Sequence, residues 1–139
     1  TQLYISVCAP DAKTYSQICR PQISRAWEKL NQTLALLHSF RCPTVMRLTS
    51  VRGLNMKNAE GYGALIRKAN PTYVEVKAYM HVGFSRHRLT FECMPSHREI
   101  KEFSNQLTKE TGYQAIDESV ESRVVLLSRL ERATKFGDG

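Results

Sequence analysis

Residues 73–80, which read YVEVKAYM, alternate apolar and polar side chains with the two-residue period of a β-strand. Two earlier segments, residues 2–7 and 44–51, show the same alternation. A central strand with helices on both faces is apolar throughout, whereas each of these strands has one polar or mixed face. We therefore expect a sheet whose apolar face is covered by helices and whose other face lines a polar cavity. The side chains expected to face that cavity are Gln2, Tyr4, Ser6, Val45, Arg47, Thr49, Tyr73, Glu75, Lys77 and Tyr79.

Apolar side chains recur at intervals of three or four residues between these strands, which is the period of a helix. We expect helices at 13–19, 24–37, 57–68 and 96–111, and further strands at 113–118 and 123–130. Ser24 is the expected N-cap of the second helix, and Ser96 with Glu99 forms a capping-box pattern. This order predicts an α/β fold with parallel strands and right-handed crossovers. The polar strand faces favour a (β/α) barrel or part of one, with helices outside, plus the terminal strands.

The charge of the chain favours a polyanionic partner. Lys and Arg number 20 against 13 Asp and Glu, so the net charge is +7, and nucleic acid is the foremost polyanion for such a chain. No apolar run approaches the ~18–20 residues that cross a bilayer, so no membrane partner is expected.

The cysteines predict neither a disulfide framework nor a metal site. Cys8, Cys19, Cys42 and Cys93 are widely and irregularly spaced, which favours ordinary core thiols in a reducing compartment, the cytoplasm. No CxxC or CxxxCxxC pattern occurs, so no residue is assigned as a metal ligand.

Charged residues on the polar strand faces allow more than one role. Lys77 could act as an acid, base or amine nucleophile in the cavity, or form a structural ion pair with Glu75. Arg47 could clamp a carboxylate or phosphate, or pair with Glu75 itself.

The segment HVGFSRHRLT, residues 81–90, is the densest basic stretch, and Arg98 and Lys101 follow it at the start of the next helix. Arginine donors interleaved with Phe84 and His87 are typical of single-stranded RNA recognition, although a solvated basic loop is the plain alternative.

Several blocks together resemble the radical S-adenosylmethionine tRNA 4-demethylwyosine synthases of wybutosine biosynthesis, in the C-terminal half of their catalytic domain. The most specific are EVKAYMHVGFSRHRLT and MPSHREI, in this order and spacing. The others are TQLYISV, RPQISRAWEKL, TVMRLTSVRGLNM, EGYGALIRKANPTYV and GYQAIDESVESRVVLLSR. The resemblance implies a partial, six-unit radical-SAM barrel, with residues 1–130 in the wyosine-forming domain and 131–139 a flexible tail.

The resemblance also implies an activity, cofactors and partners. Members of that family form 4-demethylwyosine from N1-methylguanosine beside the anticodon of phenylalanine tRNA, using pyruvate and S-adenosylmethionine. A CxxxCxxC motif on the early barrel strands holds the 4Fe-4S cluster, and a lysine there is proposed to form a Schiff base with pyruvate. This sequence lacks that motif, so we expect the cluster ligands in an upstream half of the same polypeptide and no activity of the chain by itself. The alternative is a non-catalytic truncated paralogue or fragment that retains tRNA binding only.

The residue pattern and the resemblance together place site residues in two groups, and neither identifies a catalytic base. The cofactor and substrate cavity is expected to contain Ser6, Arg47, Thr49, Asn55, Glu75, Lys77 and Tyr79. The rim on which the anticodon loop would dock is expected to contain His81, Ser85, Arg86, His87, Arg88, Arg98 and Lys101.

Overall fold

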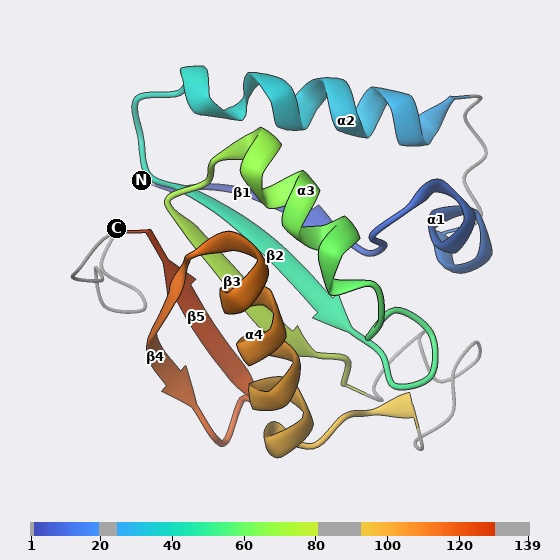
Figure 1. The fold of residues 1–139 in the computed structure, drawn as a ribbon, viewed down its shortest axis with the longest axis vertical. Coiled ribbons are helices and arrows are strands. Elements are labelled where there is room, and N and C mark those ends of the chain that lie inside the picture. Colours follow the sequence, from blue (N-terminus) through green and yellow to red (C-terminus); the bar gives the residue numbers. More distant parts are fainter. Residues whose placement is uncertain (1, 20–24, 81–92, 130–139) are drawn as a thin grey trace.

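A computed structural model describes residues 2–19, 25–80 and 93–129 of the chain. The elements follow one another in the order expected of an α/β protein (Figure 1). They are β1 (Leu3–Val7), α1 (Ala12–Cys19), α2 (Ala26–Leu36), the 3-10 turn η1 (Leu37–Ser39), β2 (Thr44–Ser50), α3 (Ala59–Ala69), β3 (Tyr73–Ala78), α4 (His97–Thr111), β4 (Gln114–Ser119) and β5 (Val124–Ser128). The predicted positions of these elements are confirmed to within a few residues at each end.

The five strands form one mixed sheet in the order β1-β2-β3-β5-β4. β1, β2 and β3 run parallel, as predicted, and their register places Ser6 beside Arg47 and Arg47 beside Glu75. β5 lies antiparallel to β3, and β4 lies antiparallel to β5. The chain therefore leaves the parallel arrangement after β3 and finishes the sheet with a β-hairpin.

The two edges of the sheet differ. Within the described residues, β1 pairs only with β2 and β4 pairs only with β5, so the sheet is open, and closure into a barrel stays a prediction. A shift in register between Ala115 and Asp117 interrupts the β4–β5 ladder. Such a bulge twists an edge strand and reduces its ability to pair with another strand.

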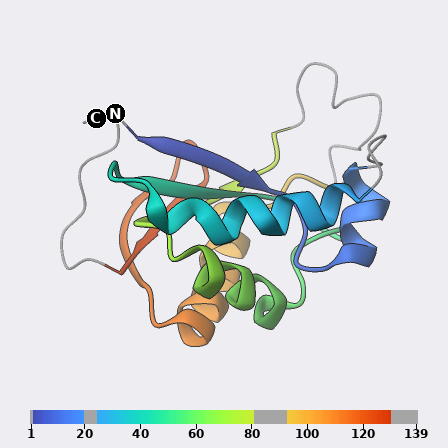
Figure 2. The ribbon, with the colours of Figure 1, turned by 90° about the horizontal axis from the view of Figure 1, so that it is seen from above.

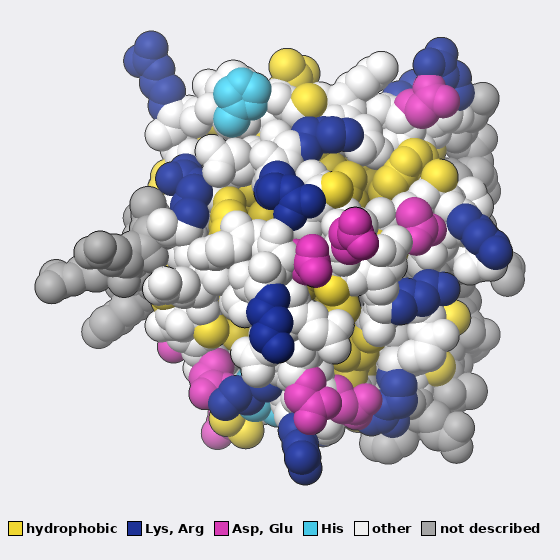
Figure 3. Space-filling view, viewed as in Figure 1, with side chains coloured by type: hydrophobic (Ala, Val, Ile, Leu, Met, Phe, Trp, Pro, Cys, Tyr) yellow, Lys and Arg dark blue, Asp and Glu magenta, His cyan; other side chains and the backbone are white. Residues whose placement is uncertain are grey.

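Three helices, α2, α3 and α4, cover the same face of the sheet, which is clearest when the molecule is seen from above (Figure 2). Figure 3 shows the outer side of this helical layer, where basic and acidic side chains are interspersed. The prediction of helices on one face is confirmed for these three helices. The other face carries the polar side chains of the parallel strands.

The hydrophobic core lies between the sheet and the helical layer. Its fully buried members include Met46 and Val76 on the strands, Leu34 on α2, Ile66 on α3 and Leu107 on α4. Burying each of these side chains stabilises the fold by about 1.5–3 kcal/mol. The core thus fixes the helical layer to one face and leaves the second face available for polar groups.

The helix ends follow the capping rules with one exception. Ser96 and Glu99 form the predicted capping box, and Gly112, at φ 80°, ends α4. Ser24, the expected N-cap of α2, lies outside the described residues. α2 instead begins after Arg25, which is left-handed and makes no side-chain capping hydrogen bond.

Gly61 allows the first turn of α3 to lie against the loop that follows β1. A methyl group on its Cα would lie 2.7 Å from Asn58 Nδ2 and 2.9 Å from the carbonyl oxygen of Pro10. Asn58 is the N-cap of α3, and its amide group also donates to Asp11, which caps α1. The absence of a side chain at Gly61 therefore allows the N-termini of α1 and α3 to lie close together, near the carboxyl end of β1.

We predict that Gly61→Ala destabilises the protein by about 1–3 kcal/mol, because the added methyl group collides with backbone at Pro10. Without the collision, Ala in place of Gly in a helix would stabilise by about 0.5–1 kcal/mol. Urea unfolding measures the difference, and Ala64→Gly, at an exposed position of the same helix, measures helix propensity alone. A Gly61→Ala protein as stable as the wild type would contradict the prediction.

Candidate functional site

The polar side chains of the parallel strands form adjacent rows on the face opposite the helices. Arg47 pairs in register with Glu75, and two residues further along β2 and β3, Thr49 pairs with Lys77. Ser6 on β1 is exposed beside Arg47. Five of the seven residues predicted for the cavity thus lie on three neighbouring strands of one face. Their local sequence explains this, because alternate residues of a strand point to the same face.

Arg47 neutralises Glu75 and stacks on an aromatic ring. The Nε atom of Arg47 donates a hydrogen bond of 3.1 Å to Oε1 of Glu75, whose side chain is only 9% exposed. The Arg47 guanidinium also lies over the ring of Tyr4, 4.7 Å from its centroid. Since a buried carboxylate needs a partner, this pair permits Glu75 to occupy the middle of the sheet. The alternative in which Arg47 pairs with Glu75 is confirmed.

Lys77 is left without a partner by this arrangement. It is half-buried, and it makes no hydrogen bond or ion pair with any described residue, Glu75 included. It lines a pocket of about 320 Å³ together with Glu75, Ser119, Ser122 and Val124. The alternative in which Lys77 forms a structural ion pair with Glu75 is therefore wrong. A half-buried, unpaired ammonium group beside two serines is suited to receive an anion.

Asn55 fastens the carboxyl ends of β1 and β2 to each other. Its Nδ2 atom donates to the carbonyl oxygens of Cys8 and Thr49, at 3.0 and 2.7 Å, and its Oδ1 atom accepts from the Val51 amide at 2.7 Å. Tyr62 of α3 donates to the Asn55 carbonyl oxygen at 3.0 Å. With Asn55 1% exposed and its side-chain amide fully used, its direct effect is to set the spacing of the strand ends.

Tyr79 lies directly after the end of β3. It is buried, and its backbone amide donates to the carbonyl oxygen of Ser50 at 2.8 Å. Tyr79 thus marks where the chain leaves the sheet, at the carboxyl ends of the parallel strands, where Asn55 also lies.

Five of the seven residues predicted to contact tRNA come from the basic segment at 81–88. His81, Ser85, Arg86, His87 and Arg88 lie outside the described residues. The two that are described both lie on α4. Arg98 is exposed and pairs with Glu102 at 3.3 Å.

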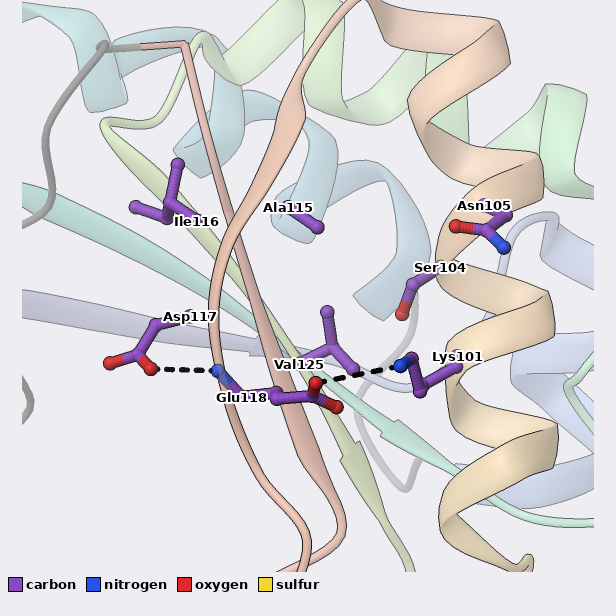
Figure 4. A pocket seen from close by; sticks show the side chains of 8 residues that line it. All are labelled: Lys101, Ser104, Asn105, Ala115, Ile116, Asp117, Glu118 and Val125. Atoms are coloured by element: carbon purple, nitrogen blue, oxygen red, sulfur yellow. Dashed lines mark hydrogen bonds and ion pairs between the residues drawn. The ribbon is translucent and has the colours of Figure 1, made fainter.

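Lys101, the other tRNA candidate on α4, lies at a second pocket, between α4 and β4 (Figure 4). Its Nζ atom points across that pocket to Oε1 of Glu118, 3.4 Å away. Glu118 also contacts Nε2 of His97 at 2.6 Å. These contacts, chiefly the one with His97, lower the pKa of Glu118.

Arg52 and Glu99 form an ion pair that sequence reasoning did not identify. Two guanidinium nitrogens of Arg52 donate to the two carboxylate oxygens of Glu99, with Nε 3.0 Å from Oε2. The Arg52 amide also donates to the carbonyl oxygen of Cys93 at 2.8 Å. The pair joins the loop after β2 to the start of α4. Only the capping-box role of Glu99 was visible in the sequence, because the two partners are 47 residues apart.

The cysteines and the acidic residues provide no metal site in the part of the chain that the structure describes. Cys42 and Cys93 are not disulfide-bonded, as expected, whereas Cys8 is disulfide-bonded, so the expectation of reduced thiols is wrong for Cys8. Spacing along the sequence does not show which residues the fold brings close together. No described helix has the length and apolarity needed to cross a membrane.

Comparison with known proteins supports the resemblance drawn from the sequence. The family model for wyosine base formation matches residues 68–129. An S-adenosyl-L-methionine-dependent tRNA 4-demethylwyosine synthase of Pyrococcus abyssi is 49% identical over 130 residues, 93% of this chain and 38% of that protein. A protein of the same name from Methanocaldococcus jannaschii is 38% identical over 95% of this chain and 42% of its own length. The chain thus spans about two-fifths of these relatives.

Solved structures show the same fold. A structure of TYW1 with a lysine–pyruvate adduct bound has a TM-score of 0.83 and 37% identity, covering 92% of this chain and 40% of that one. A crystal structure of archaeal TYW1 has a TM-score of 0.74 and 31% identity, over 92% and 39% of the two chains. The mixed α/β architecture with a five-stranded sheet is therefore shared with TYW1.

The Arg52–Glu99 pair predicts a pH dependence of stability. Arg52 lowers the pKa of Glu99 from 4.5 to about 2, with further help from Ser96. Because the folded-state pKa is the lower one, the pair stabilises the protein fully above about pH 5, and this contribution is lost as the pH falls from 4.5 towards 2. We expect Glu99→Gln to lower the urea midpoint at pH 6 and the difference from wild type to shrink towards pH 2.

Gln at position 99 preserves the capping box, so the comparison isolates the ion pair. Glu110→Gln, at an exposed position of α4, is the matched control and should leave the pH profile of wild type unchanged. A constant difference between Glu99→Gln and wild type across this pH range would show that Arg52 does not set the titration of Glu99.

Proposed function

We propose that this chain, a homologue of the tRNA 4-demethylwyosine synthases over about two-fifths of their length, supplies one wall of a tRNA-modifying active site. The reaction would form 4-demethylwyosine from N1-methylguanosine in phenylalanine tRNA, in the cytoplasm, with pyruvate and S-adenosylmethionine as co-substrates. The observation that carries the proposal is the polar face of the sheet that no described helix covers, here called the helix-free face, with its Arg47–Glu75 pair and with Lys77 unpaired among the described residues. That the relatives bear the name of synthases favours this function over a fragment that only binds tRNA.

In the architecture that we propose, the polar face of β1, β2 and β3 faces the interior of a partial radical-SAM barrel. Two features support this: the strands are parallel with their helices on the opposite face, and β1 has a free edge within the described residues. A further segment of the polypeptide, carrying the CxxxCxxC motif, would then extend the sheet beyond β1. Enzymes with a (β/α) barrel bind their ligands at the carboxyl ends of the strands. In this chain Asn55 sets the spacing between the carboxyl ends of β1 and β2.

S-adenosylmethionine fits the polar groups available on this face. Ser6 and Thr49 offer hydroxyl groups of the kind that bond ribose hydroxyls: Ser6 lies beside Arg47 on β1, and Thr49 lies two residues beyond Arg47 on β2. When bound, the cofactor would supply the radical that starts the reaction. The residues of this chain would hold and orient it, and Glu75, fixed by Arg47, would keep a negative charge in the wall at a defined position.

A 4Fe-4S cluster does not fit the described part of this chain, where no group of three or more His, Cys, Asp or Glu side chains could hold a metal. We assign no step to the cluster here. The cluster ligands would come from the further segment of the polypeptide.

For tRNA, we propose that the basic segment of residues 81–88 contacts the anticodon loop, together with Arg98 and Lys101 at the start of α4. The exposure of Arg98 and Lys101 supports a role at the rim. Lys101 would have to exchange Glu118 for a phosphate, which a surface ion pair permits at small cost.

The proposed reaction is tested with the full-length polypeptide that contains this chain, reconstituted with iron and sulfide. The substrate is phenylalanine tRNA bearing N1-methylguanosine, supplied with a reductant, S-adenosylmethionine and pyruvate. We expect nucleoside mass spectrometry to detect 4-demethylwyosine only when pyruvate is present. Cleavage of S-adenosylmethionine without any tricyclic base would refute the proposal.

The tRNA contact is tested separately by removing charges from the basic segment. Arg86→Ala with Arg88→Ala should weaken tRNA binding and lower the slope of log K against log salt by about 1 for each charge that contacts a phosphate. Lys109→Ala, an exposed lysine in the last turn of α4, is the control and should leave the slope unchanged. Wild-type affinity and slope in the double variant would make the segment an ordinary solvated surface.

A further inference from the structure

We propose that Lys77 and the turn between β4 and β5 form a subsite for the carboxylate group of a small substrate. This inference rests on the proposed function, because it concerns the same helix-free face. It adds the hairpin, in particular Ser119 and Ser122, to the site, and it gives the ligand a chemical class.

Strand register brings the turn to Lys77. Lys77 pairs with Val124 of β5, and Val124 pairs with Ser119 of β4, so the three residues form one row across three strands. Ser122 lies in the turn between the two strands of the hairpin. Together with Glu75 they line a pocket of about 320 Å³ at the edge of the helix-free face. That volume accommodates a three-carbon acid or the amino-acid part of a larger molecule.

Lys77 is the cation in this pocket whose charge is not used by the protein. Glu75, the carboxylate nearest to it in sequence, accepts from Arg47 at 3.1 Å, and Arg47 in turn rests on the ring of Tyr4. The pair of Arg47 and Glu75 has no net charge, so the ammonium group of Lys77 leaves the pocket net positive. A half-buried positive charge without a protein partner is favourable when a ligand supplies the counter-charge.

The pocket between α4 and β4 shows the contrasting arrangement (Figure 4). It also contains a lysine, Lys101, and has a similar volume of about 320 Å³. There, however, Glu118 on the opposite wall accepts from Lys101 at 3.4 Å. The protein thus neutralises one pocket lysine internally and leaves the other unpaired. Of these two pockets, the one at Lys77 is therefore the one prepared for an anionic ligand.

The hairpin turn is held firmly enough to present its hydroxyl groups. The Ala78 amide donates to the carbonyl oxygen of Arg123 at 3.0 Å, and Nη1 of Arg123 donates to the carbonyl oxygen of Pro95 at 3.0 Å. Arg123 itself has a φ of 54°, a left-handed conformation that costs energy in a residue with a side chain. These bonds anchor the turn to the end of β3 and to the segment before α4.

The serines are oriented for donation. The Ser119 hydroxyl oxygen accepts from the Ser122 amide at 3.3 Å, which leaves its hydrogen to donate. The Ser122 hydroxyl makes no hydrogen bond within the described residues. One ammonium group and two hydroxyl donors match the two oxygens of a carboxylate. In the proposed reaction two ligands carry that group, pyruvate and the methionyl part of S-adenosylmethionine.

The test uses the full-length, cluster-reconstituted enzyme and the variants Lys77→Met, Lys77→Arg and Ser122→Ala. Calorimetry measures the Kd of pyruvate and of S-adenosylmethionine separately, and fluorescence anisotropy measures the Kd of tRNA. Lys29→Met removes the same charge from an exposed position on α2 and serves as the matched control.

We expect Lys77→Met to raise the Kd of one of the two carboxylate ligands by roughly tenfold to a hundredfold, as for loss of a charge-assisted hydrogen bond, and to leave tRNA affinity unchanged. The ligand that responds is the one that occupies the subsite. Lys77→Arg should restore part of the affinity, and Ser122→Ala should weaken the same ligand by roughly two- to fivefold. Ser122 is exposed in a turn, so its variant tests the subsite even if Lys77→Met does not fold.

Unchanged Kd values for both carboxylate ligands in Lys77→Met or Ser122→Ala would overturn the proposal. A loss of tRNA affinity alone, with a reduced salt slope, would overturn it too, because the subsite would then hold a phosphate of the RNA. Failure of the proposed function is distinguishable from these outcomes. It would appear as a wild-type enzyme that makes no 4-demethylwyosine, whereas the binding measurements depend on Lys77 and Ser122 regardless of turnover.

Discussion

The ion pair between Arg47 and Glu75 is the interaction on which the helix-free face depends. A carboxylate that is 9% exposed in the middle of a sheet would lose much of its hydration without recovering it, unless a cation lies within reach. Arg47 supplies that cation from the adjacent strand, and Tyr4 holds the guanidinium from the next. The arrangement has a second effect. Because Glu75 is engaged by Arg47, Lys77 on the same strand makes no ion pair with any described residue.

The faces of the strands could be predicted from the sequence because side-chain alternation is a local property. The positions of most elements and the capping box at Ser96 and Glu99 followed from local rules as well. For Glu75 the sequence left two partners open, Arg47 and Lys77, and the β2–β3 register decides for Arg47. Other contacts between residues far apart in sequence were not predicted: the bonds from Asn55 to Cys8 and from Arg52 to Glu99 each span 47 residues. The disulfide at Cys8 was missed for the same reason.

The hairpin formed by β4 and β5 illustrates a further limit. Its two strands were expected, but their direction and their place beside β3 were not, since both are set by packing against α4 and the core. This placement matters for function. It brings the turn between β4 and β5 next to β3, the strand that carries Glu75 and Lys77. Residues outside the three parallel strands thereby become part of the candidate site.

The two edge strands of the sheet, β1 and β4, differ in how readily a further strand could pair with them. The β4 edge carries a bulge and the carboxylates of Asp117 and Glu118, which discourage another strand from pairing there. The β1 edge is regular and has an exposed tyrosine on its polar face. In the proposed barrel, a strand that extends the sheet would therefore pair with β1, because pairing at β4 is disfavoured. The difference between the two edges of the sheet therefore determines the side on which a further strand can pair, before any contact with a partner is made.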